Sequence, residues 1–216
     1  MLRKLFISIS AIVLMALPAM AQRDVTFGAR LGMDVSIPGG SANPYKVGSG
    51  FTVGAVANIP LTKGFFFEPG AMFFYSSMTA KDLLEFNKDY FYEGAAKFYG
   101  IHVPLNFGYS FPLADSWDMA VSTGPYVNFN IHARQSLNPN MSLPEPLPDM
   151  TVNLFKHGWK RVDAGWKINL SVTFAKCYYV GIGGGVNFTP LAKYGDKDKK
   201  IRIHRSTVSV TLGYNF

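Results

Sequence analysis

Apolar and polar residues alternate along eight stretches of this chain, and a period of two is typical of β-strands with one apolar and one polar face. In the last stretch, every even position from Val208 to Phe216 is apolar or aromatic, while the odd positions carry Thr, Ser, Gly and Asn. The stretches predict strands at residues 25–35, 51–59, 65–75, 98–111, 117–131, 162–174, 180–188 and 205–216. About ten residues of this pattern are enough to cross a bilayer as a tilted strand.

The connections between these strands alternate in length. Short connections follow the second, fourth and sixth strands, whereas long ones span residues 36–50, 76–97, 132–161 and 189–204. In a meander all short turns then lie at one end and all long loops at the other, which is typical of membrane barrels with short periplasmic turns. The fold class that we expect is all-β: an eight-stranded antiparallel up-and-down transmembrane β-barrel.

The apolar face of such a barrel could point either way. A soluble lipocalin-like lipid carrier would have it inside, whereas a membrane barrel has it outside. The polar positions are mostly Gly, Ser, Thr and Asn, and a water-exposed exterior normally carries many more charges. Aromatic residues recur near the strand ends on the apolar face, as they do in interfacial girdles. The pattern therefore favours a membrane barrel.

A few titratable side chains lie on the polar face and would project into the barrel. We interpret them as an interior polar cluster, formed by Arg30, Glu68, His102, Asp163 and Lys167. An interior of this size is filled by its own side chains, so free passage of solutes is not expected. Buried charges are tolerated where they are paired and hydrogen-bonded. A structural polar core is the favoured interpretation, and a gate or proton path is the alternative.

Two local features predict departures from regular strands. Pro104 lacks a backbone donor, so we expect an irregular ladder near it. Gly181 to Gly185 lacks the Lys-Ser/Thr of a phosphate loop, and its glycines at alternate interior positions are expected to let the sheet bend tightly or to make room for a large neighbour.

The first 21 residues have the pattern of a cleaved signal peptide. Arg3 and Lys4 precede a short apolar run, and Ala19 to Ala21 form a small-x-small site. We expect a signal peptide over 1–21 and one outer-membrane β-barrel domain over 22–216. Removing the leader leaves 19 of the 21 basic residues against 14 acidic ones, and this mild excess does not indicate nucleic-acid binding. A single cysteine, Cys177, excludes an internal disulfide.

Candidate chemistry is sparse. The third long connection holds Ser136, Ser142, Asp149 and His157, so a lipid-A-modifying enzyme is an alternative. Residue types alone do not make a catalytic triad, because the base must reach its nucleophile and be oriented by a third group. The four histidines show no close ligand spacing. We therefore expect no enzyme, no metal and no cofactor.

The long loops are where binding is expected. Four lysines of the fourth loop could neutralise lipopolysaccharide phosphates: Lys193, Lys197, Lys199 and Lys200. The second loop has an apolar segment that predicts a short helix or a binding patch, namely Leu83, Leu84, Phe86, Tyr90, Phe91 and Tyr92. Outer-membrane lipid, lipopolysaccharide and an envelope protein are the partners expected.

Two segments carry a family resemblance. The closing residues Leu212, Tyr214 and Phe216 look like the C-terminal signal that barrel-assembly machinery recognises in Gram-negative outer-membrane barrels. Together with Ile101 to Phe107, they make the chain resemble the PorT-like outer-membrane β-barrel family. The resemblance implies an outer-membrane location and, for some members, a link to secretion or gliding machinery. We expect a non-enzymatic barrel acting through its long extracellular loops or within an envelope or secretion assembly.

Overall fold

The computed structural model describes residues 25–40, 45–80, 85–87, 90–140, 150–194 and 201–216. The predicted signal peptide lies outside these residues. Within the described part, no helix is long and apolar enough to cross a lipid bilayer.

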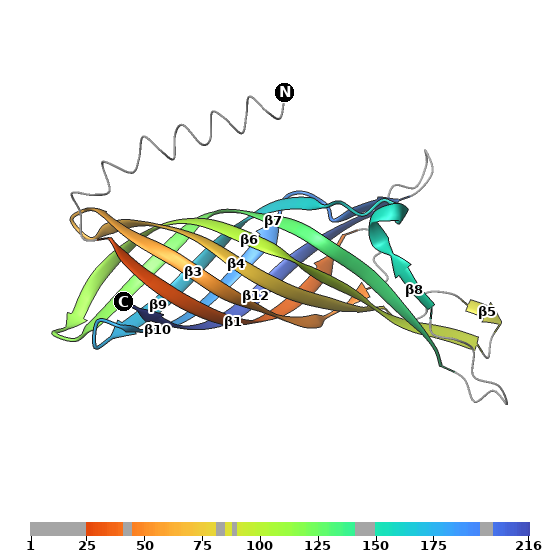
Figure 1. Ribbon diagram of the computed structural model, residues 1–216, viewed down its shortest axis with the longest axis horizontal. Helices are drawn as coiled ribbons and strands as arrows, with labels where there is room; N and C mark the ends of the chain where they lie inside the picture. The colour runs from red at the N-terminus through yellow and green to blue at the C-terminus, as the bar shows by residue number, and fades with distance from the viewer. Residues whose placement is uncertain (1–24, 41–44, 81–84, 88–89, 141–149, 195–200) are drawn as a thin grey trace, which may run out of the picture.

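Eight long strands form a closed ring (Figure 1). They are β1 (Thr26–Gly39), β3 (Gly48–Thr62), β4 (Phe65–Ala80), β6 (Tyr90–Ala114), β7 (Trp117–Asn140), β9 (Val162–Phe174), β10 (Tyr178–Asn187) and β12 (Ile201–Asn215). Every neighbouring pair is antiparallel, and the pairing of β1 with β12 closes the ring. The predicted all-β, eight-stranded antiparallel barrel is confirmed.

Small elements flank the end opposite the short turns. They are β2 (Tyr45–Lys46), β5 (Glu85–Asn87), β8 (Met150–Asn153), the 3-10 helix η1 (Leu154–His157) and β11 (Ala192–Tyr194). Each small strand pairs with the edge of a long one. We call this the outer end.

Tight turns join the strands at the other end, the turn end. Lys63 and Gly64 both have positive φ, at 45° and 87°, which is the backbone of a type I′ hairpin turn that matches the twist of the flanking strands. Ala175 and Lys176 likewise have φ of 51° and 60°. The backbone N–H of Phe216 donates to the Phe27 carbonyl oxygen at 2.8 Å, so the C-terminus is also fixed at this end.

Apolar side chains cover the outside of the ring. Along β1 the exposed Leu31 and Met33 alternate with the buried Arg30 and Gly32, and Met33 exposes 75% of its surface. The alternation recurs along other long strands, whose exposed side chains include Phe107 on β6, Ile168 on β9 and Val210 on β12. The membrane-barrel arrangement is confirmed, and the apolar interior of a lipocalin-like carrier is wrong.

Aromatic rings mark the two edges of the apolar band. At the turn end, Phe174 stacks on Trp117 and Tyr178 with centroids 5.4 and 4.9 Å away. Toward the outer end, Tyr75 and Tyr99 lie 5.0 Å apart. On β4, Phe65 and Tyr75 belong to opposite girdles and are ten residues apart. That distance is about 33 Å along a strand, or about 25 Å across the bilayer at a tilt of about 40°.

Two strands run much further than the sequence pattern predicted. β6 begins at Tyr90 rather than Phe98, and β7 ends at Asn140 rather than Ile131. The assignment of these residues to loops is therefore wrong, and Tyr90 to Tyr92 belong to a strand rather than to a short helix. Leu83 and Leu84 lie outside the described residues.

An apolar cluster lies at the outer end of the barrel, and we call it the outer plug. Its buried members are Tyr45, Phe74, Met78, Ala96, Phe98, Ala133, Leu154, Trp159, Leu191, Ala192 and Ile203. Trp159 packs edge-on against Tyr45, with ring centroids 5.6 Å apart. It also packs at a tilt against Phe98, with centroids 5.2 Å apart. The hydroxyl of Tyr45 donates to Oε1 of Gln135 at 3.1 Å. The outer end of the barrel is thereby filled by side chains.

The expected local departures are both present. Pairing of β4 with β6 skips from Pro69–Leu105 to Met72–His102, so the ladder is interrupted beside Pro104. A Cβ on Gly185 would lie 3.2 Å from the ring of Tyr126. The glycine therefore makes room for a large interior neighbour.

Candidate functional site

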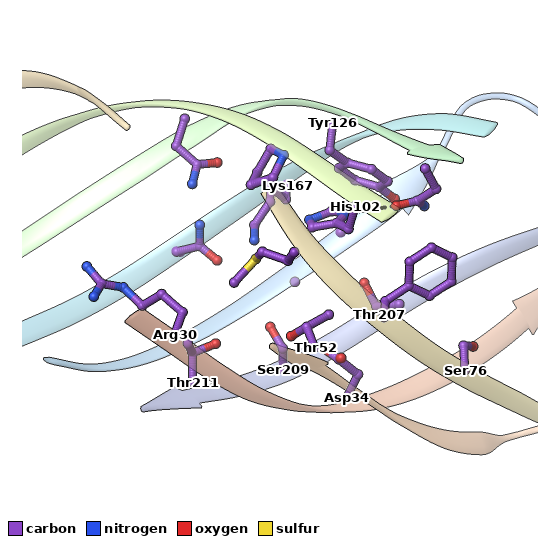
Figure 2. A pocket seen from close by; sticks show the side chains of 18 of the residues that line it. Arg30, Asp34, Thr52, Ser76, His102, Tyr126, Lys167, Thr207, Ser209 and Thr211 are labelled. Carbon is purple, nitrogen blue, oxygen red and sulfur yellow. Dashed lines mark hydrogen bonds between the residues drawn. The ribbon is translucent and has the colours of Figure 1, made fainter. Parts of the chain in front are cut away.

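A polar cavity lies inside the barrel, next to the outer plug. Its volume is about 80 Å³, which leaves room for a few water molecules at ~30 Å³ each. Side chains from all eight long strands line it, and Phe74 belongs to both the plug and the cavity wall. Figure 2 shows Lys167, His102 and Tyr126 converging from one side, opposite Asp34 and Thr52.

The centre of the first interior network is Asp163 on β9, whose side chain has no solvent exposure. Nδ2 of Asn128 donates to its Oδ1 at 2.7 Å, and Nδ2 of Asn130 donates to its Oδ2 at 2.8 Å. Asn187 donates to Oδ1 at 2.5 Å, and Nη2 of Arg205 lies 3.6 Å away. Hydrogen bonds to the charged form stabilise a carboxylate that burial would otherwise penalise.

His102 and Tyr126 extend this network. Because Nδ2 of Asn128 donates to Asp163, its Oδ1 faces His102, and Nδ1 of the imidazole donates to it at 2.6 Å. The hydroxyl of Tyr126 donates to Oδ1 of Asn187. The hydrogen bonds thus fix the donor and acceptor roles of Asn128, Asn187 and Tyr126, which favours a rigid structural arrangement.

A second network lies nearer the turn end. Nη2 of Arg30 donates to Oε2 of Glu68 at 3.3 Å, and Asn106 donates to Oε1 of the same carboxylate at 3.5 Å. The guanidinium carbon of Arg30 lies 3.9 Å from the centroid of the Tyr179 ring, which adds a cation–π contact. Arg30 and Glu68 are both buried, so this ion pair is shielded from water.

The charges of the described interior balance. Arg30, Lys167 and Arg205 carry three positive charges, and three carboxylates oppose them: Asp34, Glu68 and Asp163. Lys167 interacts electrostatically with Glu68 and Asp34. Nη1 of Arg205 and Oδ1 of Asn106 are buried without a partner among the described residues. These atoms line the cavity and suit bound water.

The structure divides the predicted interior cluster between the two networks. Arg30 pairs with Glu68, while His102 reaches Asp163 only through Asn128. Lys167 lies in the cavity wall between them. Sequence reasoning missed the partners of Asp163, namely Asn128, Asn130, Asn187 and Arg205. Period-two alternation places the asparagines inside, but only the register between strands shows which of them meet.

The other candidate residues lie at the surface or outside the described part. Leu212, Tyr214 and Phe216 point outward and are exposed; their role in assembly stays a prediction. The backbone of Lys193 lies in β11, and the remaining lysines of that loop, Lys197, Lys199 and Lys200, are outside the described residues.

Residues considered for catalysis and metal binding do not form a site in the described part. Ser136 lies on β7 and His157 ends η1, and no hydrogen bond joins them among the described contacts. Ser142 and Asp149 lie outside the described residues. No group of three His, Cys, Asp or Glu side chains gathers as a metal site in the ranges that the structure describes.

Comparison with solved structures gave distant likenesses. Neisserial surface protein A is 12% identical, with a TM-score of 0.43 over 88% of this chain and 97% of its own. Ail, the attachment invasion locus protein of Yersinia pestis, is 10% identical, with a TM-score of 0.38 over 88% and 98%. The N-terminal β-barrel domain of Pseudomonas aeruginosa OprF is 13% identical, with a TM-score of 0.30 over 87% and 97%.

Comparison at the level of sequence identifies the family of this chain. No curated protein sequence matched this chain. Residues 20–196 match the family model described as the outer membrane protein beta-barrel domain, which covers most of the chain and places it in the outer membrane. The chain thus belongs to the outer membrane protein beta-barrel domain family.

Proposed function

We propose that this chain is a non-enzymatic outer-membrane barrel that acts as a scaffold, presenting a β-ribbon to a partner in the cell envelope. The observation that carries the proposal is the extension of β6 and β7 beyond the apolar band. Their pairing continues from Tyr99–His132 to Phe91–Asn140, a further eight residues or about 26 Å along the strands. Figure 1 shows both strands running past the ends of the others.

The interior supports a scaffold rather than a channel. The outer plug fills one end, and beneath it Arg30 pairs with Glu68 and Arg205 pairs with Asp163. A group that moved protons or solutes would have to break these contacts. The interior therefore supports the interpretation of a structural polar core.

A ribbon can bind a partner through its free edge, because unpaired backbone groups accept another strand. β7 pairs with β8 only from Arg134 to Leu137. On its other side, the pairing of β7 with β6 continues to Asn140. This end of β7 is the part of the ribbon proposed to meet an envelope protein.

The test is a trimmed variant that keeps the barrel. Ala80 pairs with Gly94, and Leu137 pairs with Met150, so residues 81–93 and 138–149 can each be replaced by an Asn-Gly turn. Photo-crosslinking residues placed on the ribbon of the full-length protein should give one defined adduct in native envelopes. The trimmed variant should remain folded and lose the envelope phenotype of the intact protein.

A matched control replaces the turn Asp115–Ser116 with Asn-Gly at the other end of the barrel. This variant should retain both the adduct and the phenotype. A trimmed protein that complements a deletion strain as well as the intact one would contradict the scaffold role.

Further parts of the proposal rest on sequence. The leader over 1–21 is proposed to be cleaved after Ala21, and Leu212, Tyr214 and Phe216 to be read by the assembly machinery. Lys193, Lys197, Lys199 and Lys200 are proposed lipopolysaccharide contacts. Membership of the PorT-like group, with a role in secretion or gliding, is the finer assignment that these features support.

A further inference from the structure

Three basic side chains point outward just beyond the outer aromatic girdle. Lys97 on β6 is directly opposite Arg134 on β7, and we call these two residues the outer cation pair. Both share the outward face with Tyr99, whereas the alternate residues Phe98 and Ala133 are buried. Lys46 on β2 is exposed on the same side of the barrel and pairs with Thr79, whose other neighbour is Ala95 of β6.

The outer cation pair stands at the height of lipid headgroups. Two register steps separate Lys97–Arg134 from Tyr99–His132. The Tyr99 ring contacts His132 at 6.2 Å and Tyr75 at 5.0 Å between centroids. Two residues rise about 5 Å along the membrane normal at a tilt of about 40°. Interfacial aromatic rings lie at the edge of the hydrocarbon, so the cations lie among the polar headgroups.

The structure shows no ion pair to the outer cation pair among the side chains that it describes. Like charges directly opposite across an antiparallel ladder destabilise it. The acidic residues whose side chains are described lie inside the barrel or at the turn end: Asp34, Glu68, Asp115, Asp118 and Asp163. The interior charges are balanced, so the excess of basic residues in the sequence lies outside the interior.

We propose that the outer cation pair, with Lys46 beside it, binds a phosphate group of the phosphorylated glycolipid in the outer leaflet. Arg134 can bind phosphate oxygens through two parallel N–H groups, and Lys97 adds a second charge-assisted bond. The anion removes the repulsion between the two cations. This site lies in the barrel wall, is separate from the lysines of the fourth loop, and requires no protein partner.

The test measures lipid binding by purified, detergent-folded protein. Bisphosphorylated lipid A is the probe, and native mass spectrometry reads the fraction of protein with bound lipid. Replacing Lys97 and Arg134 by Gln should weaken binding about 10- to 100-fold, because two charge-assisted bonds are lost. Lys97→Arg should bind like the wild type. A double Gln variant that binds lipid A with unchanged affinity would overturn the proposal.

Two further measurements distinguish lipid phosphate from free phosphate, and the lipid site from the proposed scaffold role. Dephosphorylated lipid A should bind both proteins equally weakly, and inorganic phosphate at millimolar concentration should not displace lipid A. Displacement by phosphate would show a site for the free ion and overturn the lipid assignment. Lys176→Gln at the turn end removes one charge and should leave binding intact. The ribbon-trimmed variant retains Lys97 and Arg134. It should therefore bind lipid A like the wild type, whether or not the scaffold role holds.

Discussion

Asp163 is a single carboxylate with no solvent exposure, and its neighbours are amides and one arginine. Asp163→Ala would leave Arg205 as an uncompensated buried cation and free the donors of three asparagines. Breaking one side of a buried pair typically costs about 3–5 kcal/mol. We expect a loss of that size in the free energy of unfolding, measured by denaturant titration in detergent.

Arg205 provides the control for this prediction. Asp163→Asn and Arg205→Gln should each be destabilising alone, whereas the double variant of these two should lose less than their sum because no unpaired charge remains. Asp118→Asn, near the turn end, should change the unfolding free energy little. Additive losses in the double variant would contradict the coupling between Asp163 and Arg205.

Sequence reasoning at this scale could place side chains but not pair them. Alternation put Arg30, Glu68 and Asp163 on the polar face, and the structure has all three buried inside. The partners depend on register, because Asn128 meets Asp163 only through the specific pairing of β7 with β9. Arg205 was missed since it stands where its strand was predicted to begin.

Among the elements, β6 reverses its polarity at the outer girdle. Within the membrane the outward residues are apolar, as Tyr99 and Phe129 are, and the inward residues are polar. Beyond the girdle, Phe98 and Ala96 point inward into the plug while Lys97 points outward. Apolar and polar residues still alternate there, but the apolar ones point inward and the polar ones outward. A prediction that followed one apolar face therefore ended β6 and β7 too early, although it placed β9 at Val162–Phe174 as observed.

The closing strand β12 yields a prediction about assembly. Phe216 exposes 75% of its surface, so it contributes little to packing within the barrel. Phe216→Ala should lower the amount of protein in outer-membrane fractions while leaving the unfolding free energy of the purified, refolded barrel within about 0.5 kcal/mol. Immunoblots of the fractions and denaturant titration test the two parts.

Phe188 serves as the matched control, because it is also an exposed phenylalanine on the outer surface. Phe188→Ala should leave the level in the membrane unchanged. Equal loss from both substitutions would argue against a specific C-terminal signal.

The outer plug predicts a pH effect through Tyr45, which lies beyond the membrane-spanning part. Burial raises the pKa of the Tyr45 phenol from 10.0 to about 12. The folded protein keeps this proton at pH values where the unfolded chain loses it, so the contribution of Tyr45 to stability falls as the pH rises from about 10 to about 12. Thermal midpoints measured at about pH 9 and pH 11 should fall less in Tyr45→Phe than in the wild type. An identical fall in both would contradict a buried phenol.

At the scale of the whole molecule, the closed ring, the plug and the paired interior charges describe a barrel without a continuous pore. Single molecules inserted in planar bilayers should give no conductance steps at high salt, because ions would have to pass both the plug and the Arg30–Glu68 pair. Regular steps that scale with protein concentration would show that the plug opens.

The apolar face of the eight-stranded ring is expected to meet lipid. This arrangement is tested by the electrophoretic mobility of the full-length protein from outer-membrane fractions, compared before and after boiling. The unheated protein should migrate faster, since a closed barrel keeps its hydrogen-bonded ring in detergent. Recovery of the protein in the aqueous fraction, with the same mobility before and after boiling, would contradict it.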